Sequence, residues 1–594
     1  MKRCPECRRD YYDETLLYCL DDGNALLDGP RHSSEPPASA GGPFGDEPKT
    51  AILRSTDLPG EAAIRARTNT TDHTAILPGG TEAGPQSKLR GPSKKESIFA
   101  KTAAKPLAML AAAVLVLVGG FFGYRYLSAM SSDQINSIAV LPFENRGGSS
   151  DTDYLSDGLT DSLIFRFSQL PNIKVSPTSS VMRYKGKTLD LSQIAKELAV
   201  DGVLSGRLTQ IGDNLNISVQ LIDVRTEKIV WAEQYDRKLA DLLATQREIA
   251  TTLTQKMKLG FAADEKGITK KYTNSSDAYQ LYLKGRFHWG RRTKDDLDKS
   301  IDSFKQAIAL DPAFALAYVG MAEAYNSMAK DPDAPPKDCL PFGKAAAIRA
   351  LEIDPTLAEA HSALADPLAL YEWNWAESEK EFKRAIEIDP NISYIHLAYS
   401  GSYLSAAGRA DEAVREAQRA IELEPLSLIN NSVLVSSYIY ARQYEKALSQ
   451  AHAAHDLDPD FPLARLWLGL AYITNEKYAE AISQSKEGAS RPSPARWASL
   501  YVLAHAYAKA GQRAEAEKII GELKAIAKSQ YVRTYYLACV YAALGDKDKA
   551  IAELEKSFED KDTCLSRARI DPFMDPLRDD PRFAGLLQRM NLPE

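Results

Sequence analysis

The first 22 residues hold the side chains best suited to site chemistry. Cys4 and Cys7 are separated by two residues, and Cys19 is followed three positions later by Asp22. Two thiolates at that spacing fit one zinc ion, and a third thiolate with a carboxylate completes the four ligands of a structural zinc site. The spacing therefore predicts zinc held by Cys4, Cys7, Cys19 and Asp22. The alternative is a degenerate module that folds on its few apolar side chains without metal.

Residues 1–28 resemble the short zinc-ribbon modules found at the starts of bacterial signalling proteins. The resemblance rests on the runs Cys4-Pro5-Glu6-Cys7 and Cys19-Leu20-Asp21-Asp22-Gly23, in which Asp22 stands where a fourth cysteine would be. The module carries four basic side chains against seven acidic ones. Phosphate binding requires a basic patch, so we expect this module to bind a partner protein rather than a nucleic acid.

The sequence lacks the catalytic motifs of several enzyme classes, which predicts that the protein is not an enzyme. A protein kinase needs a glycine-rich loop, a His-Arg-Asp motif and an Asp-Phe-Gly motif. No such set precedes Leu107. Gly186-Lys187-Thr188 resembles the end of a phosphate-binding loop, but the required first glycine is Val181. The chain also lacks a His-Glu-x-x-His zinc motif and a Gly-x-Ser-x-Gly nucleophile motif.

Length and charge limit the protein class. The chain has 594 residues, which exceeds one ordinary domain, so several units must follow one another. A formal net charge of −7 argues against binding of nucleic acid along the whole chain. Six cysteines in this length do not form the disulfide framework of a small secreted protein.

A segment rich in glycine and proline follows the N-terminal module. Residues 29–104 contain few aromatic side chains and cannot bury enough apolar surface to fold, so we predict a disordered linker. The linker contains two copies of Thr-Ala-Ile-Leu, which begin at Thr50 and Thr74. These copies are either phosphothreonine docking sites or a coincidence in a biased sequence.

The longest uncharged apolar run, Leu107–Tyr124, predicts a transmembrane helix at 105–127. A buried helix of a globular domain is the alternative. Lysine and arginine are concentrated before the run, which predicts a single-pass protein of the bacterial inner membrane with a cytoplasmic N-terminus and periplasmic C-terminal domains. Cys339, Cys539 and Cys564 fit an oxidising compartment poorly unless they are buried.

Residues 135–262 are predicted to form a small α/β domain. Ser137–Phe143 is typical of a buried strand, the apolar residues between Leu155 and Leu170 follow helical spacing, and Leu215–Leu221 alternates apolar with polar residues. The region resembles the TolB amino-terminal domain and the related FlgO domain. The resemblance rests on the runs IAVLPFEN from Ile138, YLSDGLT from Tyr154, YKGK from Tyr184, QLID from Gln220 and WAEQYDR from Trp231. It implies a non-catalytic, usually extracytoplasmic module that joins a membrane span to tetratricopeptide repeats.

Residues 277–560 repeat with a period near 34. Prolines that end helices and a column of tyrosines recur with this period, which indicates an array of about eight helix pairs. The spacing of Leu468-Gly469, Tyr472, Tyr478 and Ala481 is similar to the tetratricopeptide family. That resemblance implies a solenoid whose concave face holds a protein or an extended peptide. Residues 561–594 are predicted to form a C-terminal cap.

The predicted fold class is therefore multidomain. It comprises a short zinc-ribbon-like head, one transmembrane helix, a small α/β domain and an all-α tetratricopeptide solenoid. The predicted function is a non-enzymatic, membrane-anchored scaffold or signalling component that captures a partner protein on its repeats. Two alternatives are a membrane-tethered transcriptional regulator and an accessory subunit of a kinase signalling system. The sequence leaves the partner and the oligomeric state open.

Overall fold

The structure is a computed structural model that describes most of the chain after residue 134. It describes residues 135–592 except for 148–151, 171–172, 188–189, 258–269, 331–333, 492 and 494. Before residue 30 it describes three two-residue strands: β1 Lys2–Arg3, β2 Asp10–Tyr11 and β3 Leu27–Asp28. These strands are antiparallel in the order β2-β1-β3.

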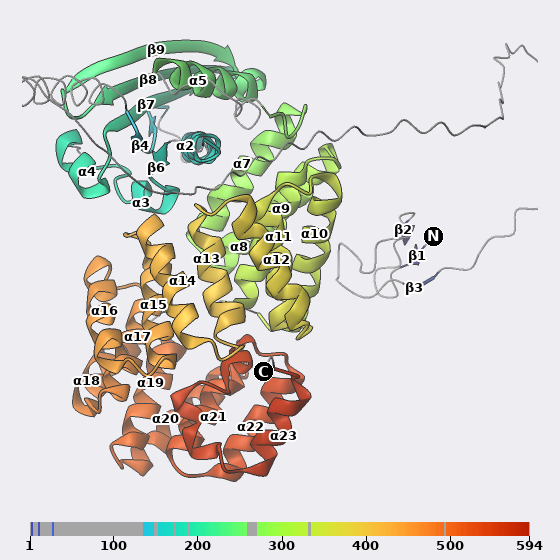
Figure 1. Cartoon of the computed structure of the whole chain (residues 1–594), viewed down its shortest axis with the longest axis vertical. Helices are drawn as coiled ribbons and strands as arrows, with labels where there is room; N and C mark the ends of the chain where they lie inside the picture. Colours follow the sequence, from blue (N-terminus) through green and yellow to red (C-terminus); the bar gives the residue numbers. More distant parts are fainter. Residues whose placement is uncertain are drawn as a thin grey trace, which may run out of the picture. The chain divides into compact units, whose positions relative to one another are not determined.

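The first domain described after residue 134 contains a mixed sheet (Figure 1). The sheet has the order β6-β4-β7-β8-β9, and β5 also pairs with β7. Its first strands are parallel, whereas β7, β8 and β9 form an antiparallel meander. The strands are β4 Ser137–Val140, β5 Glu144–Asn145, β6 Lys174–Val175, β7 Gly202–Ile211, β8 Asn214–Asp223 and β9 Lys228–Lys238.

The alternation in the sequence places one face of the meander in the core. Leu215, Ile217, Val219 and Leu221 of β8 are buried, and the residues between them are partly exposed. The turn between β7 and β8 contains Gly212 with a φ of +57°, a conformation that glycine adopts without strain. The two strands predicted in this domain are confirmed as β4 and β8.

Helices cover the buried face of the sheet and extend toward the repeats. The helix predicted from the stripe that begins at Leu155 is α2, and a second long helix, α5, packs on β9. The helices of this domain are α2 Asp153–Ser168, α3 Thr178–Met182, α4 Leu191–Leu198, the short η2 Leu239–Asp241 and α5 Leu242–Lys256.

Within the described residues, eight antiparallel helix pairs form a solenoid of the tetratricopeptide type, which confirms the predicted repeats. The first four pairs are α7 Ser276–Arg291 with α8 Lys294–Leu310, α9 Ala315–Lys330 with α10 Leu340–Ile353, α11 Ala358–Leu370 with α12 Trp375–Ile388, and α13 Ser393–Ala398, continued by η4 Tyr399–Leu404, with α14 Ala410–Leu423. The short η3 Pro336–Asp338 precedes α10. The last four are α15 Leu428–Tyr440 with α16 Tyr444–Leu457, α17 Pro462–Thr474 with α18 Tyr478–Ser490, α19 Arg496–Lys509 with α20 Arg513–Ile526, and α21 Thr534–Ala543 with α22 Lys547–Glu559.

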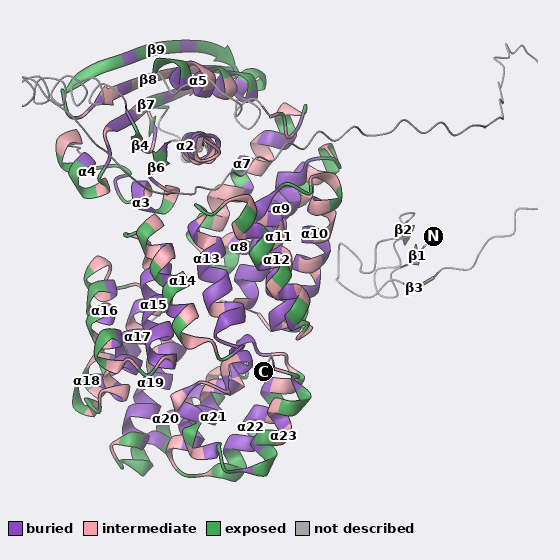
Figure 2. Ribbon diagram, viewed as in Figure 1, coloured by how far each residue is buried: buried purple, intermediate pink, exposed green. Residues whose placement is uncertain are grey.

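Small residues allow neighbouring helices to approach closely. The ring of Phe304 on α8 lies between Gly285 on α7 and Gly320 on α9. A Cβ added to Gly320 would lie only 2.4 Å from Cζ of Phe304, which is too close for any real contact. From the second pair onward the first helix of each pair is the more buried, as Figure 2 shows for α9 and α19.

The chain ends in three short helices, η5 Thr563–Arg567, η6 Pro572–Leu577 and α23 Pro581–Arg589. Leu565, Phe573, Met574 and Leu586 from this segment belong to the same buried cluster as the last four repeats. The predicted terminal segment therefore packs on the solenoid. Cys339, Cys539 and Cys564 are buried, and none of the three forms a disulfide.

The predicted fold class is wrong about the membrane. No helix among the residues that the structure describes combines the length and the apolar character needed to cross a bilayer. The longest described helix, α8, has 17 residues and an amphipathic surface with charged side chains. The transmembrane helix at 105–127 and the single-pass inner-membrane location are thus not supported. Residues 29–104 and 105–127 lie outside the described part. The described chain is mostly helical, with a small mixed-sheet domain and a tetratricopeptide-like solenoid.

Candidate binding cleft

The predicted zinc ligands Cys4, Cys7, Cys19 and Asp22 lie outside the described residues, as do Thr50 and Thr74. Within the described part of the chain, no group of three or more histidine, cysteine, aspartate or glutamate side chains is arranged to hold a metal ion. A candidate site in the described chain must therefore be sought in its cavities and charged clusters.

The C-terminal segment covers the first helices of the later repeats, which line the inner side of a solenoid of this type. Tyr535 on α21 donates to Asp571 at 2.8 Å, just before η6. The ring of His505 on α19 lies 4.7 Å from that of Phe573. His505 is fully buried, and burial lowers the pKa of its imidazole to about 3, so the ring is neutral. The chain's own C-terminus thus occupies the part of the solenoid that the family resemblance assigned to a ligand.

The last repeat also contacts the second repeat. The buried guanidinium of Arg533, just before α21, donates to the carbonyl oxygens of Ala329 and Lys330 at 2.9 and 2.7 Å. It also pairs with Asp562 at 2.7 Å. Ala329 and Lys330 end α9, so the guanidinium satisfies carbonyls that have no partner within their own helix. These bonds join two regions that lie more than 200 residues apart in sequence.

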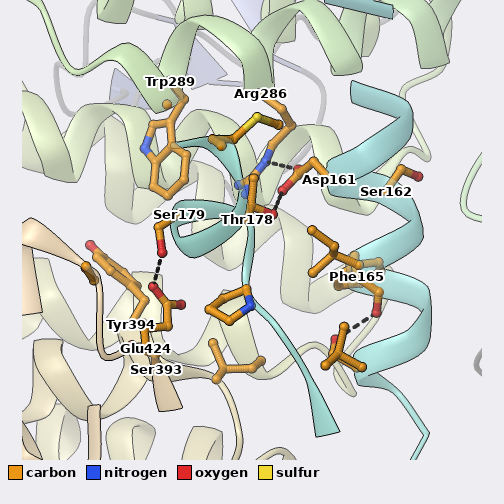
Figure 3. A pocket seen from close by; sticks show the side chains of 18 of the residues that line it. Asp161, Ser162, Phe165, Thr178, Ser179, Arg286, Trp289, Ser393, Tyr394 and Glu424 are labelled. Carbon is orange, nitrogen blue, oxygen red and sulfur yellow. Dashed lines mark hydrogen bonds and ion pairs between the residues drawn. The ribbon is translucent and has the colours of Figure 1, made fainter. Parts of the chain in front are cut away.

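A cavity of about 1340 Å³ lies between the sheet domain and the first repeats. We call it the inner cleft. Its lining comes from α2, the turn around α3, the helices α7, α9, α11, α13 and α14, and the segments that lead into α15 and α17. Figure 3 shows that side chains from the sheet domain and from the repeats face one another across it.

Arg286 is the central cation of the inner cleft (Figure 3). From α7 it donates to Asp161 on α2 at 3.2 Å and to Glu323 on α9 at 2.7 Å. Asp161 also accepts from Thr178 on α3 at 2.6 Å. Burial raises the pKa of Glu323, and Arg286 opposes this shift by stabilising the ionised carboxylate. One guanidinium therefore connects the sheet domain to two consecutive repeats.

Trp289 lies one helical turn after Arg286 and forms an aromatic wall. The guanidinium groups of Arg286 and Arg292 lie 4.4 and 4.3 Å from its ring centroid. Its indole N–H donates to Ser327 at 3.2 Å, and its ring meets that of Tyr394 edge-on at 6.4 Å. A planar ring flanked by cations is held in one orientation, so this wall is preorganised.

Two carboxyl groups on the repeat side of the cleft form no ion pair with a basic side chain among the described residues. Glu424 precedes α15 and accepts from Ser179 at 2.5 Å, and burial raises the pKa of its carboxyl. Glu359, in the first turn of α11, has a pKa raised to about 7, chiefly by burial and further by the charges of Glu323 and Asp389. Its own backbone N–H and the charge of Arg286 oppose the shift only in part.

Replacing Glu359 by glutamine is expected to stabilise the protein by about 2–3 kcal/mol at pH 8. The carboxyl has a pKa of about 7 in the folded chain against an ordinary value of 4.5, so its ionisation opposes folding. The penalty is complete above pH 7, shrinks as the pH falls from 7 to 4.5, and is absent below 4.5. Urea unfolding of both proteins at pH 8, 6 and 4.5 measures the difference. Glu352→Gln, at an exposed position, is the control, and equal stability of parent and Glu359→Gln at pH 8 would contradict the prediction.

Sequence reasoning did not identify the residues of the inner cleft. One signal for Glu424 was present, because aspartate precedes the proline at Pro312, Pro355, Pro390 and Pro459, whereas glutamate precedes Pro425. The density of aromatic and basic residues between Arg286 and Arg292 was a second signal. Neither signal shows that Glu424 meets the segment Arg286–Arg292, because the two are more than 130 residues apart in the sequence.

Family comparisons identify the repeats and give a second likeness for the sheet domain. A tetratricopeptide-repeat model matches residues 535–559, and a model of anaphase-promoting complex, cyclosome, subunit 3 matches residues 440–523. Residues 133–252 match the model of the second domain of HilA/YgeH-like transcriptional regulators. The expected likeness to TolB amino-terminal domains is not confirmed by these matches.

Curated relatives share only part of their length with this chain. "Putative adenylate cyclase 3" of Rhizobium meliloti (strain 1021) is 34% identical over 151 residues, which are 25% of this chain and 26% of the relative. The transcriptional regulator HilA of Salmonella typhimurium is 25% identical over 225 residues, which are 37% of this chain and 38% of the relative. A solved structure of Pseudomonas aeruginosa PilF is 20% identical, with a TM-score of 0.29, over 37% of this chain and 94% of that one. The family models, rather than this superposition, identify the repeats.

Proposed function

We propose that this protein is a non-enzymatic interaction component of a bacterial regulatory system, and that it captures a segment of a partner protein in the inner cleft. The repeats are a scaffold of the kind that binds proteins. The proposal rests on which part of the solenoid is covered by the chain itself and which part lines a cavity. The C-terminal segment packs on the last repeats, whereas the cavity of about 1340 Å³ is lined by the sheet domain and by repeat helices from α7 to the start of α17.

Site-specific photo-crosslinking of the full chain tests this function. A photoreactive amino acid replaces Met182 or Leu426, both of which line the cleft, and in the control it replaces the exposed Glu445 on α16. The expected result is one partner that crosslinks from both cleft positions and not from the control. The purified partner must then bind the parent chain and bind more weakly to a cleft variant. Crosslinking from Glu445 alone would refute the proposed site.

A second candidate function, regulation of transcription, is favoured by the match of residues 133–252 to the second domain of HilA/YgeH-like regulators. The kinase-accessory alternative has no comparable observation in its favour. An electrophoretic mobility shift of genomic fragments by the full chain tests DNA binding. A shift that survives physiological salt favours the regulator, because nonspecific phosphate contacts weaken steeply with salt.

We also propose that Cys4, Cys7, Cys19 and Asp22 hold one structural zinc ion. The strand β1 pairs with both β2 and β3. Cys4 and Cys7 lie between β1 and β2 in the chain, and Cys19 and Asp22 lie between β2 and β3. A module of 28 residues has few side chains with which to build an apolar core, so a metal would supply stability that so small a module lacks.

The zinc proposal predicts about one zinc per chain, falling to near zero in Cys7→Ser. Elemental analysis of the purified full chain, with Cys339→Ser as the control, measures the loss. Asp22→Cys should bind zinc more tightly, because it restores a four-thiolate ligand set. A chain that contains no zinc after purification in zinc-supplemented medium, and takes up none under reducing conditions, refutes the site.

A further inference from the structure

The strand β9 forms one edge of the sheet (Figure 1). It has 11 residues without proline or glycine, and among the residues that the structure describes no strand pairs with its outer side. All of its side chains are exposed except those of Trp231 and Tyr235, and the exposed ones include the apolar Ile229 and Val230. A long, exposed edge of this kind is a template for pairing with another strand.

The backbone of β9 directs alternate residues toward the free edge. Leu239, which follows β9, donates its N–H to the carbonyl oxygen of Asp213 at 2.8 Å. This bond continues the register in which Asn214 lies opposite Lys238. Hydrogen-bonded and non-hydrogen-bonded pairs alternate in an antiparallel ladder, so the odd-numbered residues of β9 from Trp231 onward bond to β8. The residues whose N–H and C=O groups point away from β8 are therefore Ala232, Gln234, Asp236 and Lys238.

The charges of β9 are complementary to those of a second β9 that runs antiparallel to it. If Tyr235 lies opposite itself, Glu233 lies opposite Arg237 of the second copy, and the same pair recurs on the other side of the symmetry axis. Opposite charges that face each other across a ladder stabilise the pairing. An axis at Glu233 or at Asp236 would instead place two like charges opposite each other, and an axis at Gln234 would pair no charges. The charge pattern therefore favours the register centred on Tyr235.

Contacts within one chain leave both charged side chains able to reach a second copy. Arg237 meets Glu248 on α5 at 3.3 Å, and the two side chains are 40% and 48% exposed. Glu233 accepts a hydrogen bond from Tyr235 at 3.1 Å and is exposed. An ion pair so open to solvent contributes little to stability, so exchanging it for a contact with a second copy costs little. Glu233 and Arg237 are odd-numbered residues, and across the free edge they form non-hydrogen-bonded pairs, in which the side chains lie closest.

We infer that β9 is the interface between two copies of this chain, which pair antiparallel about Tyr235 and join their sheets into one continuous sheet. The two strands exchange roughly eight backbone hydrogen bonds, two for each of four residue pairs. Glu233 and Arg237 add an ion pair on each side of the axis. None of the residues that line the inner cleft belongs to β9, so this dimer goes beyond the proposed function and leaves partner capture in the cleft unaffected.

Sedimentation velocity of the purified full chain over a range of micromolar concentrations tests the interface. The 65.4 kDa chain is expected to sediment as a dimer. Glu233→Arg and Arg237→Glu each replace both ion pairs by like-charge contacts, so each variant alone should raise the dissociation constant of the dimer about tenfold. An equimolar mixture of the two variants should regain the affinity of the parent, because the basic side chains of one then face the acidic side chains of the other. Arg207→Glu, at an exposed position on the central strand β7, is the control and should leave the affinity unchanged.

Four results would each overturn the inference. They are a monomeric parent chain over this range, a dimer that neither β9 variant weakens, an equal loss in the Arg207→Glu control, and a mixture that associates no better than the separate variants. A dimer that neither β9 variant weakens would place the association on another surface of the chain. The mixture also distinguishes a lost interface from a misfolded variant, because a misfolded chain would not regain association on mixing.

Discussion

Replacing Arg533 by methionine is expected to lower the free energy of unfolding by about 3–5 kcal/mol, because it leaves the buried Asp562 carboxylate without its cation. Both side chains are almost completely inaccessible to solvent, at 1% and 0% exposure. The same substitution removes the donors to the carbonyls that end α9. Urea unfolding followed by circular dichroism measures the loss. Hydrogen exchange is expected to increase at the end of α9, where the last repeat contacts the second.

Two further variants separate charge from packing at Arg533. Asp562→Asn in the Arg533→Met background removes the stranded charge and should recover about 1–2 kcal/mol. Arg513→Met, which removes an exposed pair with Glu517, should cost less than about 1 kcal/mol. If Arg533→Met were no more harmful than Arg513→Met, the contact between α9 and the last repeat would contribute little to stability.

Replacing Arg286 by methionine is expected to destabilise the chain by about 3–5 kcal/mol at pH 8 and by less at pH 5. The substitution leaves Asp161 and the buried Glu323 facing each other without their shared cation. Burial already raises the pKa of Glu323, and loss of the guanidinium raises it further. Ionisation of Glu323 therefore opposes folding more strongly in the variant, and the penalty for burying its charge falls as the pH is lowered.

The place where hydrogen exchange increases in Arg286→Met distinguishes loss of the Arg286 contacts from a general destabilisation of the chain. Hydrogen exchange should increase in α2 and α7 before it increases in α21, because Arg286 joins the sheet domain to the first repeats. Arg286→Lys should retain part of the stability, since one ammonium cannot reproduce both contacts of the planar guanidinium. Arg384→Met, at an exposed pair with Glu387, is the matched control. A uniform increase of exchange along the chain would show that Arg286 does not specifically join the two domains.

The location of the free cleft has a consequence for partner selection. The C-terminal segment packs on the last repeats, and the sheet domain contributes 19 of the 51 residues that line the inner cleft. A partner would therefore contact α2 and α3 as well as the repeat helices (Figure 3). Specificity would then depend on both domains together, through groups such as Ser179 and Glu424, which meet across the cleft.

Several elements of the fold could be predicted from sequence because their signals are local. The alternation around β8 and the helical stripe of α2 reflect which face of each element is buried. The period near 34 identified the helix pairs, because every repeat must satisfy the same contacts with its neighbours. The apolar run Leu107–Tyr124 shows the limit of this approach. Composition alone suggested a membrane span, and no described helix supports one.

The amino-acid sequence by itself determined the order of the elements, the repeat architecture and the absence of recognised catalytic motifs. Only the tertiary structure decided where the solenoid is open, because that depends on the C-terminal segment packing against helices such as α19 and α21. It also decided which charges are compensated. Arg286, Glu323 and Glu359 have ordinary residue types, and only the meeting of α7, α9 and α11 reveals that one carboxylate is paired and the other is not. Such pairings depend on distances between residues remote in sequence, which no local pattern encodes.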